Sequence, residues 1–264
     1  MSEFILKARN LNKFYTQRAG RLGFGTKTVK ALDDVSLELR RGSTLAVVGE
    51  SGSGKSTLAR CLLQLQPLDG GSVLFQGRDL ADLPAAELRS QRRYLQMIFQ
   101  DPFASLNPRM NVGEIVSEGL VIHSLGDREE RHEKTKQMLE RVGLRAADMK
   151  KYPHEFSGGQ RQRIGIARAL VLSPKVVVCD EPVSALDVSI QAQILLLLKE
   201  LQQEMSLSYI FITHDLRVVR HIADDVAVMY QGKIVEIDKV NKIYQSPKEE
   251  YTRNLLSAIP GKKR

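Results

Sequence analysis

Hydrophobic positions along this chain form two patterns: short β-favouring runs, and longer segments with apolar residues three or four apart. The first β-favouring runs occupy residues 4–9, 35–40 and 44–48, and a glycine-rich turn follows the third. A helical pattern begins near Lys55 and ends before Pro67. The N-terminal part therefore predicts a strand, a glycine loop and a helix in that order.

The middle of the chain changes to helical periodicity. Strand-like runs at residues 72–76 and 95–99 precede it, and helices are predicted at 112–122 and 129–142. After residue 156 strands and helices alternate again, which favours a mostly parallel sheet. The later elements are a helix through residue 170, a strand at 176–179, a helix at 190–204, a strand at 209–212, a further helix, and strands near 226 and 234.

These patterns predict a single α/β domain with one helical insertion. The expected parts are a core of residues 1–100 and 157–237, a helical subdomain of 101–156, and a short C-terminal tail of 238–264 with two helices. Apolar residues make up 42% of the chain and charged residues 27%, as in folded globular proteins. No apolar run approaches the ~20 residues of a membrane-spanning helix.

The N-terminus and the cysteines predict a cytoplasmic protein. Glu3, Lys7 and Arg9 interrupt the N-terminal residues, which therefore do not resemble a signal peptide. Cys61 and Cys179 lack the spacing of a metal site or a disulfide framework. The 39 basic and 31 acidic residues give a net charge of +8, which is compatible with nucleic acid, an anionic membrane or phosphate ligands. Since the excess is dispersed and no long basic run is interleaved with aromatic residues, we expect no nucleic-acid partner.

The strongest local motif is a phosphate-binding loop between a predicted strand and a predicted helix. Its glycines would let backbone N–H groups surround a β-phosphate, while Lys55 and the helix N-terminus offset the phosphate charge. Ser56 would offer its hydroxyl to Mg²⁺. The alternative, a chance glycine-rich turn, is weakened by the motifs downstream. The candidate ATP-binding residues here are Gly49, Glu50, Ser51, Gly52, Ser53, Gly54, Lys55, Ser56 and Thr57.

Two acids end the apolar run at residues 176–179. The carboxyl end of a buried parallel strand faces a ligand crevice, which suits Asp180 and Glu181 to a functional role. Asp180 would hold Mg²⁺ through its water shell, and Glu181 would orient the water that attacks a γ-phosphate. The alternative is that Asp180 caps a turn and Glu181 is solvated.

A second anion cradle is predicted where two glycines open the helix that follows residue 156. Its residues are Ser157, Gly158, Gly159 and Gln160. Ser-Gly-Gly-Gln is the signature sequence of ABC ATPases, and the chain resembles this family. The resemblance implies that the signature of one subunit caps the γ-phosphate held by the P-loop of another, so that hydrolysis requires a dimer and uses ATP and Mg²⁺.

The resemblance also implies the fold and further site residues. The implied fold is an α/β P-loop NTPase (RecA-like) core with a mostly parallel sheet, an antiparallel β subdomain and an inserted α-helical subdomain. Gln100 would contact Mg²⁺ and the attacking water, His214 the γ-phosphate, and Tyr15, next to Phe14, the adenine ring. Isolated residues like Gln100 and His214 are more often surface or capping residues. The implied inter-subunit loop is Ser184, Ala185, Leu186 and Asp187.

Residues 100–109 and 152–156 are similar to the peptide and nickel importer branch, and this match covers nearly the whole chain. It implies a peripheral protein at the cytoplasmic face of the membrane, with a second ATPase subunit of a different paralogous chain, two permease subunits and an extracytoplasmic solute-binding protein as partners. Phe103 and Leu106 would belong to the permease-docking surface. Many branch members end with Pro-His-Pro-Tyr-Thr and a cysteine-bearing tail. Because residues 247–252 depart from that motif and no cysteine follows, uptake of peptides and of nickel or metal chelates both stay open.

Two other functions are compatible with parts of the sequence. A soluble ABC ATPase acting on nucleic acid or ribosomes would usually carry a coiled-coil insertion or a second ATPase half, and the sequence has neither. A degenerate regulatory subunit would be expected to have lost motif residues. All five of the principal ones are intact: Lys55, Ser157, Asp180, Glu181 and His214.

Overall fold

A computed structural model describes residues 3–18 and 26–258 of the protein. The chain divides into two compact units. The first contains the described residues up to Leu83 and those from Ile210 onward, and the second contains Pro84–Tyr209. The helices predicted as a separate subdomain of residues 101–156 lie in the same unit as the part of the predicted core that begins at residue 157. They do so because they pack against α6 (Gly158–Leu170).

The first unit contains an antiparallel sheet with strand order β2-β1-β4-β5. Its strands are β1 (Phe4–Arg18), β2 (Thr26–Arg40), β4 (Gly70–Phe75) and β5 (Arg78–Asp79). Leu6 and Ala8 of β1 and Leu37 and Leu39 of β2 are buried, whereas residues between them are more exposed. This alternation buries one face of the sheet. The two long strands extend well beyond the runs predicted from the sequence.

A second sheet in this unit is built from β3 (Thr44–Val48), β9 (Asp225–Tyr230), β10 (Lys233–Lys239) and the end of β8 (Ser208–Thr213), in the order β10-β9-β3-β8. β3 and β9 are parallel, as predicted from the alternation of strands and helices. β10 is antiparallel to β9. Gln231 (φ 46°) and Gly232 (φ 80°) form the two-residue turn between them, and a turn that short joins only antiparallel strands.

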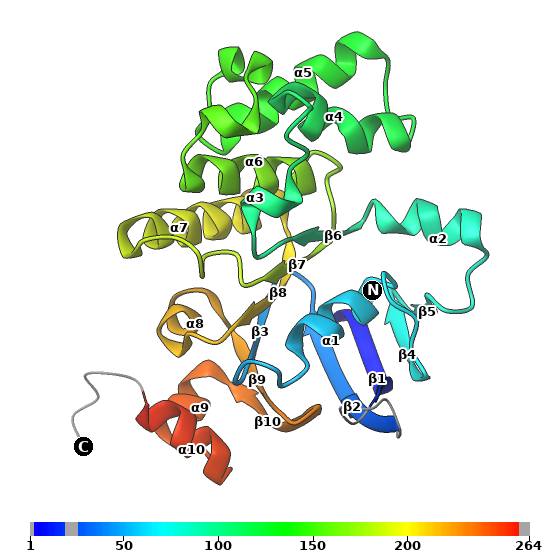
Figure 1. Ribbon diagram of the computed structural model, residues 1–264, viewed down its shortest axis with the longest axis vertical. Coiled ribbons are helices and arrows are strands. Elements are labelled where there is room, and N and C mark those ends of the chain that lie inside the picture. Colours follow the sequence, from blue (N-terminus) through cyan, green and yellow to red (C-terminus); the bar gives the residue numbers. More distant parts are fainter. Residues whose placement is uncertain (1–2, 19–25, 259–264) are drawn as a thin grey trace. The chain divides into compact units, whose positions relative to one another are not determined.

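The helices of the first unit are α1 (Lys55–Leu62), α8 (Leu216–Ile222), α9 (Val240–Gln245) and α10 (Glu250–Ser257). The last two confirm the pair of short helices predicted near the C-terminus (Figure 1). Tyr244 and Leu256 from these helices share a buried cluster with Val48 and Val228. The C-terminal helices therefore pack against the strands that carry the glycine-rich loop.

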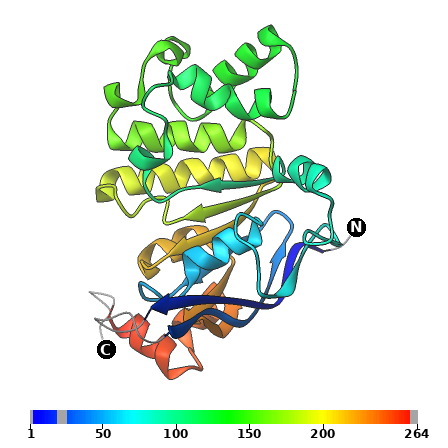
Figure 2. The same ribbon diagram turned by 45° about the vertical axis from the view of Figure 1, so that its right-hand side comes forward.

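The second unit combines two parallel strands with a set of helices. β6 (Leu95–Ile98) pairs with β7 (Val176–Asp180). α4, α5 and α6 lie next to one another (Figures 1 and 2). The remaining elements include two 3₁₀ helices, and the full set is α2 (Ala85–Arg92), α3 (Pro102–Ser105), α4 (Val112–Ile122), α5 (Arg128–Arg141), η1 (Ala146–Lys150), η2 (Pro153–Glu155), α6 and α7 (Val188–Met205).

Side-chain caps define where α4 and α5 begin. Asn111 accepts a hydrogen bond from the Glu114 N–H, and the Glu114 carboxylate accepts one from the Asn111 N–H, each at 2.9 Å. Asp127 and Glu130 form the same reciprocal pair at the start of α5. Such a capping box satisfies backbone donors that a helix N-terminus leaves free.

Two general expectations from composition can be compared with the structure. Among the described residues, no helix is both long and apolar enough to cross a membrane. Cys61 and Cys179 are buried and free. Burial raises the pKa of the Cys61 thiol to about 11, which keeps it protonated and unreactive.

Candidate functional site

The predicted phosphate-binding loop connects β3 to α1 in the first unit, and its glycines are required by its geometry. Gly49, Gly52 and Gly54 have φ angles of 154°, 80° and 108°. A Cβ atom at Gly49 would lie 2.1 Å from the Met229 carbonyl oxygen, and one at Gly54 would lie 2.3 Å from the Ala31 carbonyl oxygen. Both contacts are with backbone, so neither neighbour could move aside cheaply. The loop therefore follows a path that larger residues could not adopt.

Lys55 lies within this loop rather than extending into solvent. It is 5% exposed, and its Nζ donates to the carbonyl oxygens of Gly49 at 2.8 Å and Glu50 at 2.7 Å. α1 begins at Lys55, and the N-cap residue, Gly54, has no side chain with which to accept the first-turn N–H groups. An ammonium group beside a glycine-rich helix N-terminus suits a phosphate ligand.

The neighbouring predicted residues line the loop and the first turn. Ser51 is exposed and Ser53 is buried, while Ser56 and Thr57 are partly buried at the start of α1. Two contacts to this loop were not predicted from the sequence. The Gly232 N–H donates to the Ser53 carbonyl oxygen at 2.9 Å, and the Glu50 N–H donates to the Tyr251 hydroxyl at 3.1 Å. Since both partners are far downstream in sequence, no local signal could have revealed them.

Phe14 and Tyr15 lie on β1, where they pair with Lys30 and Val29 of β2. Successive strand residues point to opposite faces, so the two rings are on opposite sides of the sheet. Phe14 is 37% exposed, and its N–H donates to the Asp69 carboxylate at 2.6 Å. Ala31, the next residue of β2, adjoins Gly54 of the loop. The aromatic pair is thus close to the loop along β2, and adenine stacking by Tyr15 stays a prediction.

His214 is an exposed residue between β8 and α8 in the first unit. The following residue, Asp215, caps α8 by accepting from the Arg217 N–H at 2.8 Å. Hydrogen bonds from the Arg217 side chain also lower the pKa of Asp215. This cap fixes the backbone beside His214.

The second unit brings together two of the predicted catalytic residues. Gln100 follows β6, and Asp180 and Glu181 end and follow its parallel neighbour β7, so their strands finish at the same sheet edge. The Gln100 Nε2 donates to Glu181 Oε2 at 3.1 Å, although the residues are 81 positions apart. Asp180 is 5% exposed, and Glu181 has a left-handed backbone with φ of 47°. Non-glycine residues seldom adopt this conformation, and those that do are often found at functional sites.

The signature residues form the N-terminus of α6. Ser157 Oγ accepts from the Gln160 N–H at 3.4 Å, and Gln160 Oε1 accepts from the Ser157 N–H at 3.0 Å. A Cβ atom at Gly159 would lie 2.6 Å from Ile190 Cγ2, whereas one at Gly158 would lie 3.6 Å from Leu186 Cδ2. Gly159 is therefore needed for packing against α7, and Gly158 is not.

The predicted inter-subunit loop precedes α7. Ser184 Oγ donates to the Glu181 carbonyl oxygen at 3.1 Å, and Asp187 caps α7 by accepting from the Ile190 N–H at 3.0 Å. Ala185 is exposed and Leu186 partly buried. Gln191, which the sequence did not single out, donates to the carbonyl oxygens of Leu186 in the loop and of Val183 just before it, at 3.0 Å each. These bonds fix the loop conformation from the first turn of α7.

The two residues expected at a docking surface have different environments. Phe103 is 62% exposed, and the centroid of its ring lies 3.9 Å from the Arg161 guanidinium carbon. Leu106 is only 2% exposed. The prediction for Leu106 was wrong, because the chain turns its side chain into the unit after α3. Phe103 remains available at the surface.

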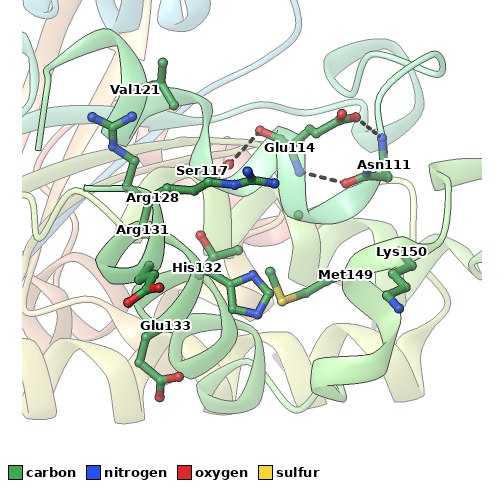
Figure 3. A pocket seen from close by; sticks show the side chains of 13 residues that line it. Asn111, Glu114, Ser117, Val121, Arg128, Arg131, His132, Glu133, Met149 and Lys150 are labelled. Atoms are coloured by element: carbon green, nitrogen blue, oxygen red, sulfur yellow. Dashed lines mark hydrogen bonds between the residues drawn. The ribbon is translucent and has the colours of Figure 1, made fainter. Parts of the chain in front are cut away.

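A recess of about 1020 Å³ lies between α4, α5 and η1 in the same unit (Figure 3). Basic and acidic side chains share its lining, including Arg131, His132 and Glu133, and Met149 adds an apolar part. Figure 3 shows the Asn111–Glu114 capping bonds at its edge. All the residues that line the recess belong to the second unit.

A glycine loop between β3 and α1 and an acidic pair after a buried parallel strand define an α/β P-loop nucleotide hydrolase. The chain belongs to the ABC transporter family, whose sequence profile matches residues 32–184. It is an ATPase of that family.

Relatives over nearly the whole chain are named as peptide-transport ATP-binding proteins. Identity is 51% over 259 residues with the oligopeptide transport ATP-binding protein AppF of Bacillus subtilis (strain 168), covering 98% of this chain and 79% of that protein. It is 52% over 258 residues with the di/tripeptide transport ATP-binding protein DppF of Pseudomonas aeruginosa (strain UCBPP-PA14), covering 98% and 80%.

Solved structures confirm the fold. The ATP-binding cassette MJ0796, in a dimeric post-hydrolysis state bound to ADP and Pi, matches with a TM-score of 0.78 and 30% identity, covering 89% of this chain and 98% of that one. CbiO1 from Clostridium perfringens, part of the ABC transporter complex cbiONQ, matches with a TM-score of 0.79 and 29% identity, covering 98% and 97%.

Proposed function

We propose that this chain is the ATP-hydrolysing subunit of a peptide importer, acting at the inner face of the membrane with permease subunits and an extracytoplasmic binding protein. The names of relatives at about 50% identity support peptides over nickel or metal chelates. The chain would supply the ATPase, while separate chains would cross the membrane.

The exposed signature at the start of α6 carries the proposal that two subunits act together. Ser157 and Gln160 are both exposed at a helix N-terminus, which is a site for an anion. The chain already has a complete glycine loop with Lys55 for its own nucleotide. The second anion site, at the signature, would therefore bind the nucleotide held by another subunit. The dimeric state named for MJ0796 is consistent with this arrangement. We expect the second subunit to be a paralogous ATPase.

Each candidate residue then has a distinct role. Lys55 would offset phosphate charge, Glu181 would orient and polarise the attacking water, and Gln100 would keep Glu181 in place through the hydrogen bond between them. His214 would contact the γ-phosphate.

A bound Mg²⁺ would neutralise charge on the β- and γ-phosphate oxygens. The residues proposed to hold it are Ser56, Gln100 and Asp180. Their oxygen donors are the type that Mg²⁺ prefers, and the buried position of Asp180 at the end of β7 suits a carboxylate that acts on a cation rather than on bulk water.

Phe103 is proposed to contact a permease. One face of its exposed ring packs against the Arg161 guanidinium. Arg161 is itself fixed by a hydrogen bond from its Nε to the Pro153 carbonyl oxygen at 2.7 Å. A rigidly supported, exposed aromatic ring is typical of an interface anchor. The ring is on the same unit as Gln100 and Glu181, so a movement near the acidic pair could be transmitted to it through one compact body.

The decisive experiment compares Glu181→Gln and Lys55→Ala in the assembled transporter. Glu181→Gln should retain ATP and a closed ATPase pair while turnover falls by at least ~100-fold, because the group that positions water is lost. Lys55→Ala should instead weaken nucleotide binding itself. Wild-type turnover in the Glu181→Gln complex would refute the assigned role, and uptake of a nickel chelate but not of peptides would refute the substrate class.

A further inference from the structure

Tyr251 of α10 contacts the phosphate-binding loop. The Tyr251 hydroxyl on α10 accepts the Glu50 N–H at 3.1 Å. The carbonyl oxygen of the same Glu50 accepts a hydrogen bond from Lys55 Nζ at 2.7 Å. Glu50 is therefore held at its N–H by the C-terminal helix and at its carbonyl by the loop lysine.

The Tyr251 ring is fixed by a second aromatic residue. Its centroid lies 4.2 Å from that of Tyr230, with the ring planes tilted by 36°. Tyr230 ends β9, just before the turn whose Gly232 N–H donates to the Ser53 carbonyl oxygen. The β9–β10 turn and α10 together support the loop at two different residues.

α10 is itself firmly attached to the first unit. The buried Glu236 carboxylate accepts the N–H groups of Lys248 at 2.9 Å and Glu249 at 3.2 Å, just before the helix begins. Leu256 is 2% exposed in the cluster that includes Val48, the residue directly before the loop. α10 thus packs against the strand that leads into the nucleotide site.

We infer that Tyr251 is a positioning residue for nucleotide binding: its hydroxyl holds the N–H of the Gly49–Glu50 peptide, and the carbonyl oxygen of that same peptide, from Gly49, accepts a hydrogen bond from Lys55 Nζ at 2.8 Å and sets the position of the ammonium group. This inference rests on the proposed role of Lys55 in binding phosphate. Burial raises the pKa of Tyr251, so the hydroxyl stays neutral at physiological pH. Because coupling between sites is reciprocal, a bound nucleotide should also stabilise the docking of α10.

Tyr251→Phe in the full-length chain tests the inference, since it removes the hydroxyl and keeps the ring against Tyr230. The dissociation constant for fluorescently labelled ADP should rise by about 2- to 10-fold, or ~0.4–1.4 kcal/mol, which is the size of one neutral hydrogen bond. ADP is used because it has no γ-phosphate, so the proposed contact of His214 with that phosphate does not contribute to the measured affinity. Bound ADP should slow amide exchange in α10 of the wild type, and less so in the variant.

Tyr244→Phe is the matched control. Tyr244 is buried in the same cluster, and its hydroxyl donates to the Leu216 carbonyl oxygen rather than to the loop. This variant should lose stability and keep its affinity for ADP. Unchanged affinity in Tyr251→Phe, or an equal loss in both variants, would overturn the inference. Unchanged affinity in Lys55→Ala would instead overturn the proposed phosphate site.

Discussion

Replacing Gly159 with alanine should destabilise the protein, whereas the same change at Gly158 should not. The new Cβ at residue 159 would lie 2.6 Å from Ile190 Cγ2, about 1 Å inside the ~3.5–4.0 Å of an ordinary carbon contact. Overpacking of this kind costs about 1–3 kcal/mol, and the higher helix propensity of alanine offsets up to ~1 kcal/mol. We therefore expect Gly159→Ala to lower the free energy of unfolding by about 1–2 kcal/mol.

Gly158→Ala supplies the control, since its Cβ would make an ordinary 3.6 Å contact with Leu186 Cδ2. The measurement is urea unfolding followed by far-UV circular dichroism, because the chain contains no tryptophan. In a double-mutant cycle, Ile190→Ala should remove the penalty of Gly159→Ala. Equal stability of Gly159→Ala and the wild type, or a penalty that persists with Ile190→Ala, would refute the steric argument.

This comparison also separates packing from nucleotide contact within the signature. Since Gly158→Ala should keep its stability, a loss of ATPase activity in that variant would report on the surface proposed to face the nucleotide. A loss of ATPase activity in Gly159→Ala alone would not separate these two causes, because this variant changes both the packing against α7 and the proposed nucleotide-facing surface. The signature glycines are therefore not equivalent, although the sequence motif treats them alike.

Two further predictions concern buried groups. Burial raises the pKa of Glu236, but the Lys248 and Glu249 amides, Thr252 and the Lys248 charge together outweigh it and lower the pKa overall. At pH 7 the wild type should be more stable than Glu236→Gln. Urea unfolding at a series of pH values should show this difference disappearing as the pH falls below ~4.3, because a lowered folded-state pKa stabilises the protein only while the carboxylate is ionised. A constant difference in stability down to pH 3 would contradict this. Leu106→Ala should cost about 2–4 kcal/mol and Phe103→Ala less than ~1 kcal/mol in the same unfolding assay, and the reverse order would contradict the burial described here.

Local patterns in the sequence were sufficient for elements that carry their own boundary signals. α4 spans the predicted residues because Asn111 and Glu114 cap its start and apolar residues follow at helical spacing. α2 was missed because it has no buried residue, and thus no apolar stripe to detect. Side-chain direction after Gln100 depends on how the chain turns, which is why Leu106 was wrongly placed at the surface.

The candidate site was predictable where its residues are adjacent in sequence. The glycine loop and the acidic pair are contiguous motifs whose expected chemistry follows from residue type and spacing, whereas the role of the contiguous signature was implied by the family resemblance. The hydrogen bond between Gln100 and Glu181 follows from the pairing of β6 with β7, which periodicity alone does not reveal. The contacts from Gly232 and Tyr251 to the loop depend on tertiary packing, so only the structure could show them.

The hydrogen bonds that Gly232 and Tyr251 make to Ser53 and Glu50 affect when the loop becomes stable during synthesis. The glycine loop is synthesised early, but Gly232 and Tyr251 are added about 180 and about 200 residues later. A nascent chain therefore emerges with its loop motif complete and its supports missing. Tight nucleotide binding should begin only once Gly232 and Tyr251 have been synthesised, so products truncated before them would not compete for ATP.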